Sequence, residues 1–281
     1  MLFPKQTINC KGHLLSLEQP QVMGILNCTP DSFYDGGKYR VEADLLRQAE
    51  KMLEEGAAII DIGGASSRPG ADWVSVDEEL SRVLPAIELI RKYFPDALLS
   101  IDTVWSEVAR RSIAAGVCMV NDISAGRIDP KLYDMVAELG VPYILMHMQG
   151  RPDTMQVQPV YEDVVLEVLD FFIAEVGKLR ALGVKDIILD PGFGFGKQVS
   201  HNYSLLKEMH VFGILELPVL AGISRKSMIN KVLGTKPEHA LYGTTALHVV
   251  ALQQGAKLLR VHDVKPAVQT IKLWQTLENA D

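Results

Sequence analysis

Short apolar segments recur along the chain, and each is followed by a polar or glycine-rich turn and then by a segment with helical spacing. The apolar segments are residues 22–27, 58–64, 98–103, 119–124, 143–148, 186–192, 219–224 and 257–263. Their hydrophobicity is continuous rather than alternating, which is typical of strands that are covered on both faces. Because parallel neighbours need a crossover helix between them, the pattern predicts eight repeats of strand and helix.

Three of the intervening segments carry apolar stripes at helical spacing, which predict helices that pack on a sheet. The stripes are Val76, Leu80, Val83, Leu84, Ile87 and Ile90; Val165, Val168, Leu169, Phe172, Val176 and Leu179; and Val264, Val268, Ile271, Trp274 and Leu277. Core packing accounts for these residues, so we assign their aromatic side chains no cofactor role.

The number and spacing of these units predict an α/β fold, a (β/α)8 TIM barrel, since eight units in about 260 residues match its size. Residues 7–19 precede the first unit, and we expect their two short runs to form an N-terminal hairpin that closes the bottom of the barrel. No segment has the composition of an interdomain linker, which favours a single domain over residues 1–281. An open doubly wound sheet is the second choice, because the chain lacks a Rossmann fingerprint.

Composition and charge narrow the class of protein and its partners. The chain has 48% hydrophobic and 22% charged residues and a net charge of −7, as in soluble globular proteins that repel nucleic acid and anionic membranes. We therefore expect no nucleic acid and no membrane as partner.

The first residues lack the pattern of a secretion signal, and Cys10, Cys28 and Cys118 have no disulfide or zinc-site spacing. A cytoplasmic protein is expected.

The predicted strands end in polar residues. These are Asn27, Asp61, Asp102, Asn121 with Asp122, His147, Asp190, Ser224 with Arg225 and Lys226, and Arg260 with His262 and Asp263. In a TIM barrel the C-terminal ends of the strands share one face, where active sites form. One such carboxylate is as readily a loop cap or an ion-pair partner, but a ring of them around a common mouth indicates a ligand site, because each buried charge needs a partner.

The carboxylates and amides in this ring suit a flat ligand with an amidine-like edge. A carboxylate accepts two parallel N–H bonds from a 2-amino-pyrimidinone, and an asparagine beside it both donates and accepts. Asp102, Asn121 and Asp190 fit these roles, and Lys226 fits as a cation that neutralises one of the carboxylates. The alternative for Lys226 is a surface lysine that follows a helix cap.

The basic residues at the strand ends indicate an anion. Arg260 and His262 are two positions apart on one strand, so their side chains face the same way and can form a clamp. We expect Ser224 to cap a short helix that ends at Gly234, and its backbone N–H groups would form an anion site near Arg225. An ordinary cap without a ligand explains that segment equally well.

Two loops are longer than the barrel requires, and we expect them to close over a substrate as lids. They span residues 29–38 and 65–75 and carry the side chains Phe33, Tyr34, Arg68 and Trp73. Arg68 is expected to contact the substrate. Ordinary connecting loops are the alternative, but they would not explain why these aromatic side chains lie there.

The segment DPGFGFGKQ, residues 190–198, has some features of a phosphate-binding loop but does not fit its requirements. Pro191 stands where that loop needs glycine, and Gln198 stands where it needs Ser or Thr. The segment also lacks the glycine spacing of a dinucleotide site. The sequence therefore implies no nucleotide cofactor.

Eight strings at the strand ends are recognisable as a set. In chain order they are MGILNCTPDSFYDGG, DIGGASSRPGA, SIDT, NDIS, LMHMQGRPDTMQ, LDPGFGFGK, GISRKSM and LRVHDV. Together they closely resemble the bacterial dihydropteroate synthases, from about Val22 to Val264. The resemblance implies a (β/α)8 barrel that joins 4-aminobenzoate to 6-hydroxymethyl-7,8-dihydropterin diphosphate with Mg²⁺ and releases pyrophosphate. It also implies a sulfonamide target in folate biosynthesis and a homodimer formed through the later helices.

The resemblance further assigns roles to residues. It implies that the pterin is bound by Asp102, Asn121, Asp190, Lys226, Met146, Phe195 and Arg260. It implies that the diphosphate lies near Ser67, Arg260 and His262, with Asn27 as the contact of Mg²⁺. It places 4-aminobenzoate under Phe33 and Pro69, with its carboxylate at Ser224. Two departures from the family pattern are Ser67, where Thr is common, and Cys28, where Val is common; Ser67 keeps the hydroxyl.

These roles imply a substitution in which the protein mainly stabilises charge. We expect Asp190 and Lys226 to stabilise a cationic methylene on the dihydropterin. The departing diphosphate would be met by the other catalytic groups, Arg260 and His262. Two rival functions remain, a methyltransferase that binds a methylated folate and a catalytically silent pterin-binding barrel. The SRKS segment, the long first loop and the Arg260–His262 pair favour a diphosphate substrate over methyltetrahydrofolate. No expected charged position is vacant, which argues against the silent barrel.

Overall fold

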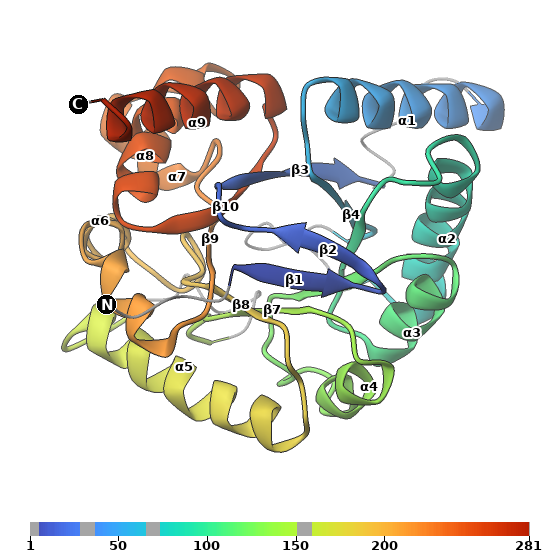
Figure 1. Ribbon diagram of the computed structural model, residues 1–281, viewed down its shortest axis with the longest axis horizontal. Helices are drawn as coiled ribbons and strands as arrows, with labels where there is room; N and C mark the ends of the chain where they lie inside the picture. Colours follow the sequence, from blue (N-terminus) through green and yellow to red (C-terminus); the bar gives the residue numbers. More distant parts are fainter. Residues whose placement is uncertain (1–5, 29–36, 66–73, 151–158, 281) are drawn as a thin grey trace.

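Eight parallel strands close into a barrel in the computed structural model, which describes residues 6–28, 37–65, 74–150 and 159–280 (Figure 1). The barrel strands are β3 (Gln21–Asn27), β4 (Ile59–Gly63), β5 (Leu99–Asp102), β6 (Met119–Asp122), β7 (Tyr143–Met146), β8 (Ile187–Asp190), β9 (Val219–Ala221) and β10 (Ala256–Val261). Strand β10 closes the ring by pairing with both β9 and β3. The predicted (β/α)8 barrel and all eight of its strands are confirmed.

Helices surround the barrel and pack on its outer face (Figure 1). They are α1 (Gly37–Glu54), α2 (Val76–Tyr93), α3 (Ser106–Ala114), α4 (Lys131–Leu139), α5 (Val164–Ala181), α6 (Val199–Lys207), α7 (Ser227–Leu233), α8 (Leu241–Gln253) and α9 (Val264–Glu278), with 3-10 turns η2 (Met209–Leu215) and η3 (Pro237–His239). Within the described residues, no helix is long and apolar enough to cross a membrane.

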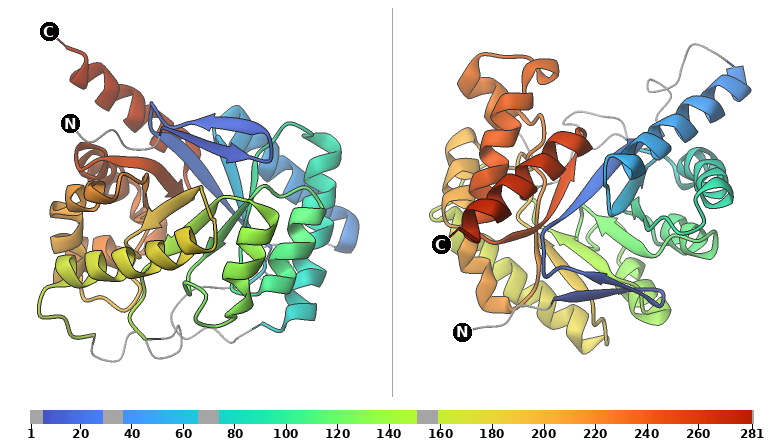
Figure 2. Two further views of the ribbon diagram at one scale, coloured as in Figure 1. Left: turned by 60° about the horizontal axis from the view of Figure 1, so that its bottom comes forward. Right: turned by 45° about the horizontal axis from the view of Figure 1, so that its top comes forward.

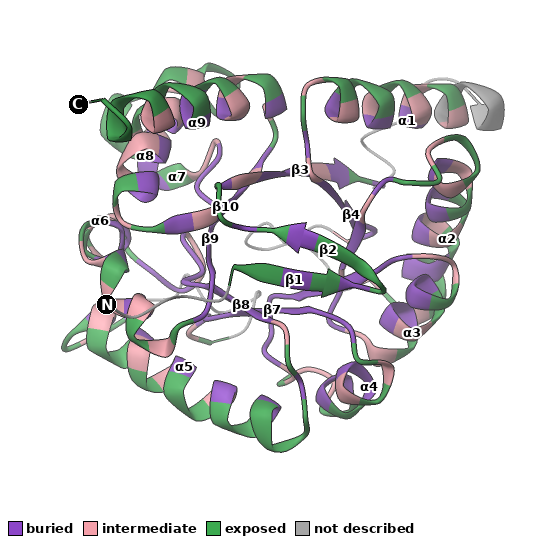
Figure 3. Cartoon of the chain, in the orientation of Figure 1, coloured by how far each residue is buried: buried purple, intermediate pink, exposed green. Residues whose placement is uncertain are grey.

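The apolar stripes of the helices form the core between the helices and the barrel. Leu80, Val83, Ile87 and Ile90 of α2 are buried there, as the spacing predicts, and Figure 3 shows the buried positions on the inner sides of the helices. The stripe on α9 is confirmed only in its first turns. Leu277 in the last turn is 63% exposed, because α9 runs past the end of the core (Figure 2).

A two-stranded hairpin closes the N-terminal end of the barrel, as predicted. It consists of β1 (Thr7–Cys10) and β2 (His13–Ser16), which pair antiparallel and lie across the barrel opening in Figure 1. Ile8 of the hairpin packs with the inward-facing Met23 and Ile144 in one buried cluster. At the turn, Lys11 and Gly12 adopt positive φ, and Lys11 Nζ donates to the carbonyl of Ile113 at 3.0 Å. The opposite end of the barrel is therefore the place for a site.

Candidate active site

Side chains alternate between the inner and outer faces of the strands, and in the C-terminal half of the barrel several polar side chains point inward. The register pairs Gly63 of β4 with Asp102 of β5, and Asp102 with Asn121 of β6. Inward positions near the hairpin are apolar, whereas those nearer the C-terminal mouth are charged or polar. Asp61, Asn121 and Asp190 are nevertheless almost fully buried. The strand ends therefore converge on one mouth, as the sequence predicts.

Arg260 of β10 connects two carboxylates in this mouth. Its Nε donates to Asp61 Oδ2 and its Nη2 donates to Asp102 Oδ2, each at 2.6 Å. Asn121 Nδ2 also donates to Asp61 Oδ2, at 2.9 Å. The other oxygen of Asp61, Oδ1, is buried and has no hydrogen-bond partner among the described residues. The mouth is thus a charge-paired network with one buried carboxylate oxygen left unpaired.

Burial shifts the acidity of the carboxylates. It raises the pKa of Asp102 to about 7, opposed by Arg260 and helped by the neighbouring charge of Asp61. It also raises the pKa of Asp190, against the opposing effect of Lys226. Groups with perturbed acidity in a concave site are typical of binding and catalysis. These carboxylates are poorly solvated, so hydrogen bonds from a ligand would replace the water they lack.

Lys226 lies at the N-cap position of α7 and reaches into the same mouth. Its Nζ donates to the carbonyl of Phe193 at 2.5 Å and lies 4.7 Å from the centroid of the Phe195 ring. A Cβ at Gly222 would lie 3.7 Å from Lys226 Nζ and 3.9 Å from Asp190 Oδ2, so both charged groups face the space over that glycine. Burial lowers the pKa of Lys226 to about 8, opposed by Asp190.

An apolar wall stands beside these charges. Met146 is buried with Val104, Ile123 and Met148, and the half-buried Phe195 packs against this cluster. Met146 is also opposite Asp190 in the register of β7 and β8. The wall therefore places apolar and aromatic surface next to a carboxylate, as a flat heterocycle requires.

The expected cap at Ser224 is wrong. Helix α7 begins at Ser227, and Lys226 occupies its N-cap position. The reason is local: Arg225 has φ of 56°, a left-handed conformation that cannot continue into a helix, so residues 223–226 form a turn instead. Ser224 Oγ accepts a hydrogen bond from the backbone N–H of His262 at 3.2 Å and lies 3.2 Å from its Nδ1.

The basic residues of the mouth are less available than the sequence indicates. Arg225 forms a two-pronged ion pair with Asp263, with Nε···Oδ2 of 2.8 Å and Nη2···Oδ1 of 2.6 Å, so its charge is already matched. Desolvation and the cations Arg260 and Arg225 lower the pKa of His262 to about 4. His262, though exposed, is neutral at physiological pH and offers a hydrogen bond rather than a charge.

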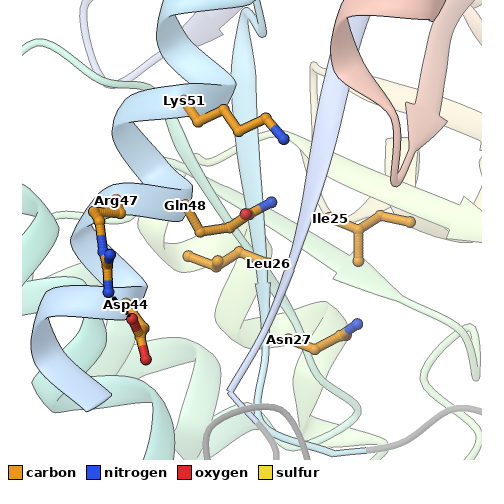
Figure 4. A pocket seen from close by; sticks show the side chains of 7 residues that line it. All are labelled: Ile25, Leu26, Asn27, Asp44, Arg47, Gln48 and Lys51. Carbon is orange, nitrogen blue, oxygen red and sulfur yellow. Dashed lines mark hydrogen bonds and ion pairs between the residues drawn. The ribbon is translucent and has the colours of Figure 1, made fainter. Parts of the chain in front are cut away.

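Asn27 lies at the exposed end of β3 and borders a second hollow. This cavity, of about 530 Å³, lies between the end of β3 and one face of α1 and is lined by Ile25, Leu26, Asn27, Asp44, Arg47, Gln48 and Lys51 (Figure 4). Arg47 pairs with Asp44 there. On its other side, Asn27 Oδ1 faces Gly63, next to Asp102. Asn27 therefore stands at the rim of the mouth.

Two strand-end residues point away from the mouth. Asp122 follows Asn121 and faces outward, where its carboxylate accepts from the Tyr143 hydroxyl at 2.6 Å and from the N–H groups of Ser124 and Gly126. His147 is buried, with its ring 4.9 Å from the ring of Phe171. Both side chains therefore make structural contacts and do not face the mouth. A structural role is the alternative given above for a single residue of the ring.

Some predicted contacts lie outside the described residues. These are Phe33, Ser67, Arg68 and Pro69. The lid side chains Tyr34 and Trp73 also lie outside the described residues, and with them both lid predictions. Sequence reasoning also gave no ligand role to Asp61, although it sits at the centre of the network. Alternation along residues 58–64 carried that signal, because it puts Ile59 and Asp61 on the same inward face.

Comparison with known proteins decides the family. Residues 23–262 match the family described as pterin binding enzyme. Over 265 residues the chain is 47% identical to the dihydropteroate synthase of Escherichia coli strain K12, covering 94% of this chain and 93% of the relative. The chain belongs to the dihydropteroate synthase family. The resemblance carried by the strand-end motifs is confirmed.

Solved structures of dihydropteroate synthases agree with this fold along nearly the whole chain. The Yersinia pestis enzyme in a sulfonamide drug complex has a TM-score of 0.91 and 43% identity and covers 98% of this chain and 100% of its own. The Xanthomonas albilineans enzyme with 4-aminobenzoic acid has a TM-score of 0.92 and 42% identity and covers 98% and 99%. The dihydropteroate synthase barrel is thus reproduced from the hairpin to α9.

Proposed function

We propose that the protein joins 6-hydroxymethyl-7,8-dihydropterin diphosphate to 4-aminobenzoate and so forms 7,8-dihydropteroate and pyrophosphate in folate biosynthesis. The observation that carries this proposal is the contact of one arginine, Arg260, with both Asp61 and Asp102 in a mouth shared with Asp190 and Lys226. The relative from Escherichia coli is named for this activity, and the one from Xanthomonas albilineans was solved with 4-aminobenzoic acid.

The pterin ring fits the buried polar half of the mouth. Its amino-pyrimidinone edge offers parallel N–H donors, which a carboxylate accepts in pairs. We assign the edge of the ring to Asp102, Asn121, Asp190 and Lys226, and its faces to Met146, Phe195 and Arg260. The almost complete burial of Asp190 and Asn121 supports this assignment, because such groups discriminate strongly against a ligand that leaves them unpaired.

The diphosphate fits the rim, where Arg260 and His262 lie two positions apart at the end of β10 and just after it. Arg260 supplies positive charge, and His262, with its lowered pKa, supplies a neutral hydrogen bond. Ser224 lies against His262 and is assigned to the carboxylate of 4-aminobenzoate. Ser67, Arg68, Phe33 and Pro69 stay predictions for the same rim and for the 4-aminobenzoate site.

The reaction breaks the C–O bond between the pterin methylene and the diphosphate, whose oxygen keeps the electron pair. Asp190 and Lys226 hold the electron-rich ring, which delocalises the positive charge left on the methylene, while the N–H groups of Arg260 that do not bind Asp61 or Asp102 donate to the leaving group. The lone pair of the 4-aminobenzoate nitrogen then forms the C–N bond, and that nitrogen loses a proton to water. An aromatic amine is neutral at pH 7, so the attack needs no strong general base.

Magnesium belongs to this proposal. Mg²⁺ prefers oxygen ligands and commonly uses one or two protein ligands together with substrate phosphates and water. The described residues hold no cluster of three or more His, Cys, Asp or Glu side chains arranged for a metal, which suits an ion that arrives with the diphosphate. Asn27 Oδ1, facing Gly63 at the rim, fits as its protein contact. When bound, the ion would neutralise charge on the leaving group.

We also propose a homodimer in the cytoplasm. The helices α7, α8 and α9, of which α8 contacts the other two, each carry exposed apolar side chains, among them Tyr242 at 86% and Leu273 at 75% exposure. Burying such side chains against a second copy would remove apolar surface from water. Light scattering of the wild type and of Tyr242→Glu tests the dimer.

The cysteines support the cytoplasm as the compartment. Cys10, Cys28 and Cys118 are all free and buried, which suits a reducing compartment.

Titration calorimetry separates this function from its rivals. Pterin diphosphate is titrated into the protein with and without Mg²⁺, and 4-aminobenzoate is then added while pyrophosphate is measured. We expect binding that is stronger with Mg²⁺, followed by pyrophosphate release. Binding without release would favour a silent pterin-binding barrel, and binding of methyltetrahydrofolate in preference to the diphosphate would favour a methyltransferase.

A further inference from the structure

A buried lysine lies behind the mouth and takes no part in the reaction described above. Lys197 is only 3% exposed and stands at the end of the loop between β8 and α6. Its Nζ lies 2.9 Å from His147 Nδ1, 3.2 Å from the carbonyl oxygen of His147, and 3.0 Å from the carbonyl oxygens of both Gly192 and Phe195. All four partners are neutral, and no salt bridge of Lys197 is formed within the described residues.

These partners match a protonated amine. Three of them are carbonyl oxygens, which only accept, and a lysine ammonium offers three donors and no acceptor. Burial and the nearby Lys197 lower the pKa of His147 to about 2, so its imidazole is neutral. In the tautomer that leaves Nδ1 without a proton, Nδ1 accepts from Lys197, and the three N–H donors are shared among four acceptors. Burial lowers the pKa of Lys197 well below its usual value, and the nearby charge of Asp190 opposes that effect. The three carbonyl acceptors around Nζ are the observation that favours the ammonium form.

The ammonium holds two loops that touch through their backbones. A Cβ on Gly192 would lie 1.9 Å from the carbonyl oxygen of His147, and a Cβ on Gly196 would lie 2.4 Å from that of Gln149. Only glycine permits so close an approach, and both glycines adopt positive φ. The approach brings several carbonyl oxygens together, and Lys197 offsets their mutual repulsion.

The loop between β8 and α6, which Lys197 holds in place, carries an aromatic side chain that lines the mouth. Phe195 lies between the two close glycines, its carbonyl is bound by Lys197, and its ring packs on Met146 and its neighbours and lies near Lys226 Nζ. The carbonyl of Phe193 in the same loop accepts from Lys226. Displacement of this loop would therefore move two groups assigned to the pterin.

We propose that Lys197 is a positioning residue for pterin binding, which fixes the ring of Phe195 by tying the loop after β8 to the loop after β7. It does not contact the substrate. The inference rests on the proposed function, since it names a residue that prepares the same site. Lys197 is the lysine of residues 190–198, the segment that does not fit a phosphate-binding loop. In the structure this lysine binds backbone carbonyls.

A double-mutant cycle tests this inference. The equilibrium Kd for pterin diphosphate is measured by calorimetry for the wild type, Lys197→Met, Phe195→Ala and the double variant. We expect Lys197→Met to weaken binding about tenfold when Phe195 is present and to have little effect when it is absent, because residues in one network are coupled. If the two losses simply multiply, Lys197 does not act through Phe195 and the proposal is wrong.

Controls separate positioning from general destabilisation. Lys207→Met makes the same substitution on α6 at an exposed position, and Leu206→Ala removes buried packing from that helix. Both are expected to keep the wild-type Kd, although Leu206→Ala lowers the melting temperature. If Lys197→Met does not fold, Lys197→Gln, which keeps N–H donors, takes its place in the cycle.

The outcomes distinguish this inference from the proposed function. A wild-type protein that does not bind pterin diphosphate would overturn both. Tight binding by the wild type and by Lys197→Met alike would overturn the positioning role alone. Equal weakening by Leu206→Ala at matched stability would also overturn it, since the effect would then be general.

Discussion

Arg260 on the last strand donates to Asp61, 199 residues earlier in the chain, with an Nε···Oδ2 distance of 2.6 Å. Asp61 is completely buried, so this contact supplies a counter-charge that water does not. The same guanidinium reaches Asp102. One side chain thus joins β10 to β4 and β5 across the mouth and compensates two carboxylates at once.

Replacing Arg260 with Ala is expected to destabilise the fold as well as the complex. Two buried carboxylates lose their partner, and breaking a buried ion pair on one side costs about 3–5 kcal/mol. Urea unfolding at pH 7 measures this loss. Arg110→Ala, which breaks an exposed pair with Glu138, is the matched control and should change stability much less.

The cost of Arg260→Ala should also depend on pH in a defined direction. Without the arginine, the folded-state pKa of Asp102 rises further above its unfolded value of 3.8. The folded state then binds more protons than the unfolded state, so stability falls as pH rises through the raised pKa. Unfolding at pH 5 and pH 8 should show a larger loss of stability at pH 8; an equal loss at both would mean that the pKa of Asp102 does not respond to the arginine.

Arg260→Ala should affect the two substrates unequally. Because the guanidinium is assigned to the diphosphate, calorimetry should show a much greater loss of affinity for pterin diphosphate than for 4-aminobenzoate. Equal losses would refute the Arg260–His262 clamp. Measurements on protein that remains folded by circular dichroism keep this effect apart from the stability loss.

Asp190→Asn and Lys226→Ala are expected to abolish turnover while leaving the barrel folded. Asp190 is the carboxylate opposite Met146 in the register, and Lys226 faces it over Gly222, so each variant removes a charge from the pterin pocket. Steady-state rates with circular dichroism as a control measure this. A near-normal rate in either variant would remove that residue from the mechanism.

The pH dependence of pterin binding should report Lys226. Burial lowers its pKa to about 8, so the ammonium loses its proton, and binding should weaken, as pH rises through that value. Lys226→Arg keeps its charge in that range and should remove the alkaline limb from a calorimetric pH series. A limb near pH 8 that persists in Lys226→Arg would belong to another group.

Much of the fold could be predicted from the sequence because its signals are local. Strands such as residues 143–148 are short apolar runs, and Ser75 and Asp163, which cap α2 and α5, are typical N-cap residues. Alternation likewise put Arg260 and His262 on the same side of their strand. The same alternation distinguishes Asn121, which enters the mouth, from Asp122, which faces outward, although both were expected in the polar ring.

Other features depend on backbone conformation and distant partners. Ser224 has a typical capping side chain, but the left-handed Arg225 moves the start of α7 to Ser227. The partners of Lys197 are mostly backbone carbonyls, which no residue pattern encodes. The pairing of Arg225 with Asp263 is likewise visible only in the folded chain.

The hairpin should contribute to stability and not to catalysis. Ile8 is fully buried at the closed end, where residues of a TIM barrel serve the fold. Ile8→Ala is expected to cost about 2–5 kcal/mol in urea unfolding. It should leave kcat/KM at the wild-type value at a temperature where the variant is folded. A large fall in kcat/KM would indicate that the closed end influences the mouth.

The stoichiometry of product formation tests the central claim most directly. Pyrophosphate and dihydropteroate are measured together in the wild-type protein supplied with pterin diphosphate, Mg²⁺ and varied 4-aminobenzoate. The account predicts one pyrophosphate for each dihydropteroate and almost no pyrophosphate when 4-aminobenzoate is omitted. Pyrophosphate released at the same rate without the amine, or no release with both substrates present, would contradict it.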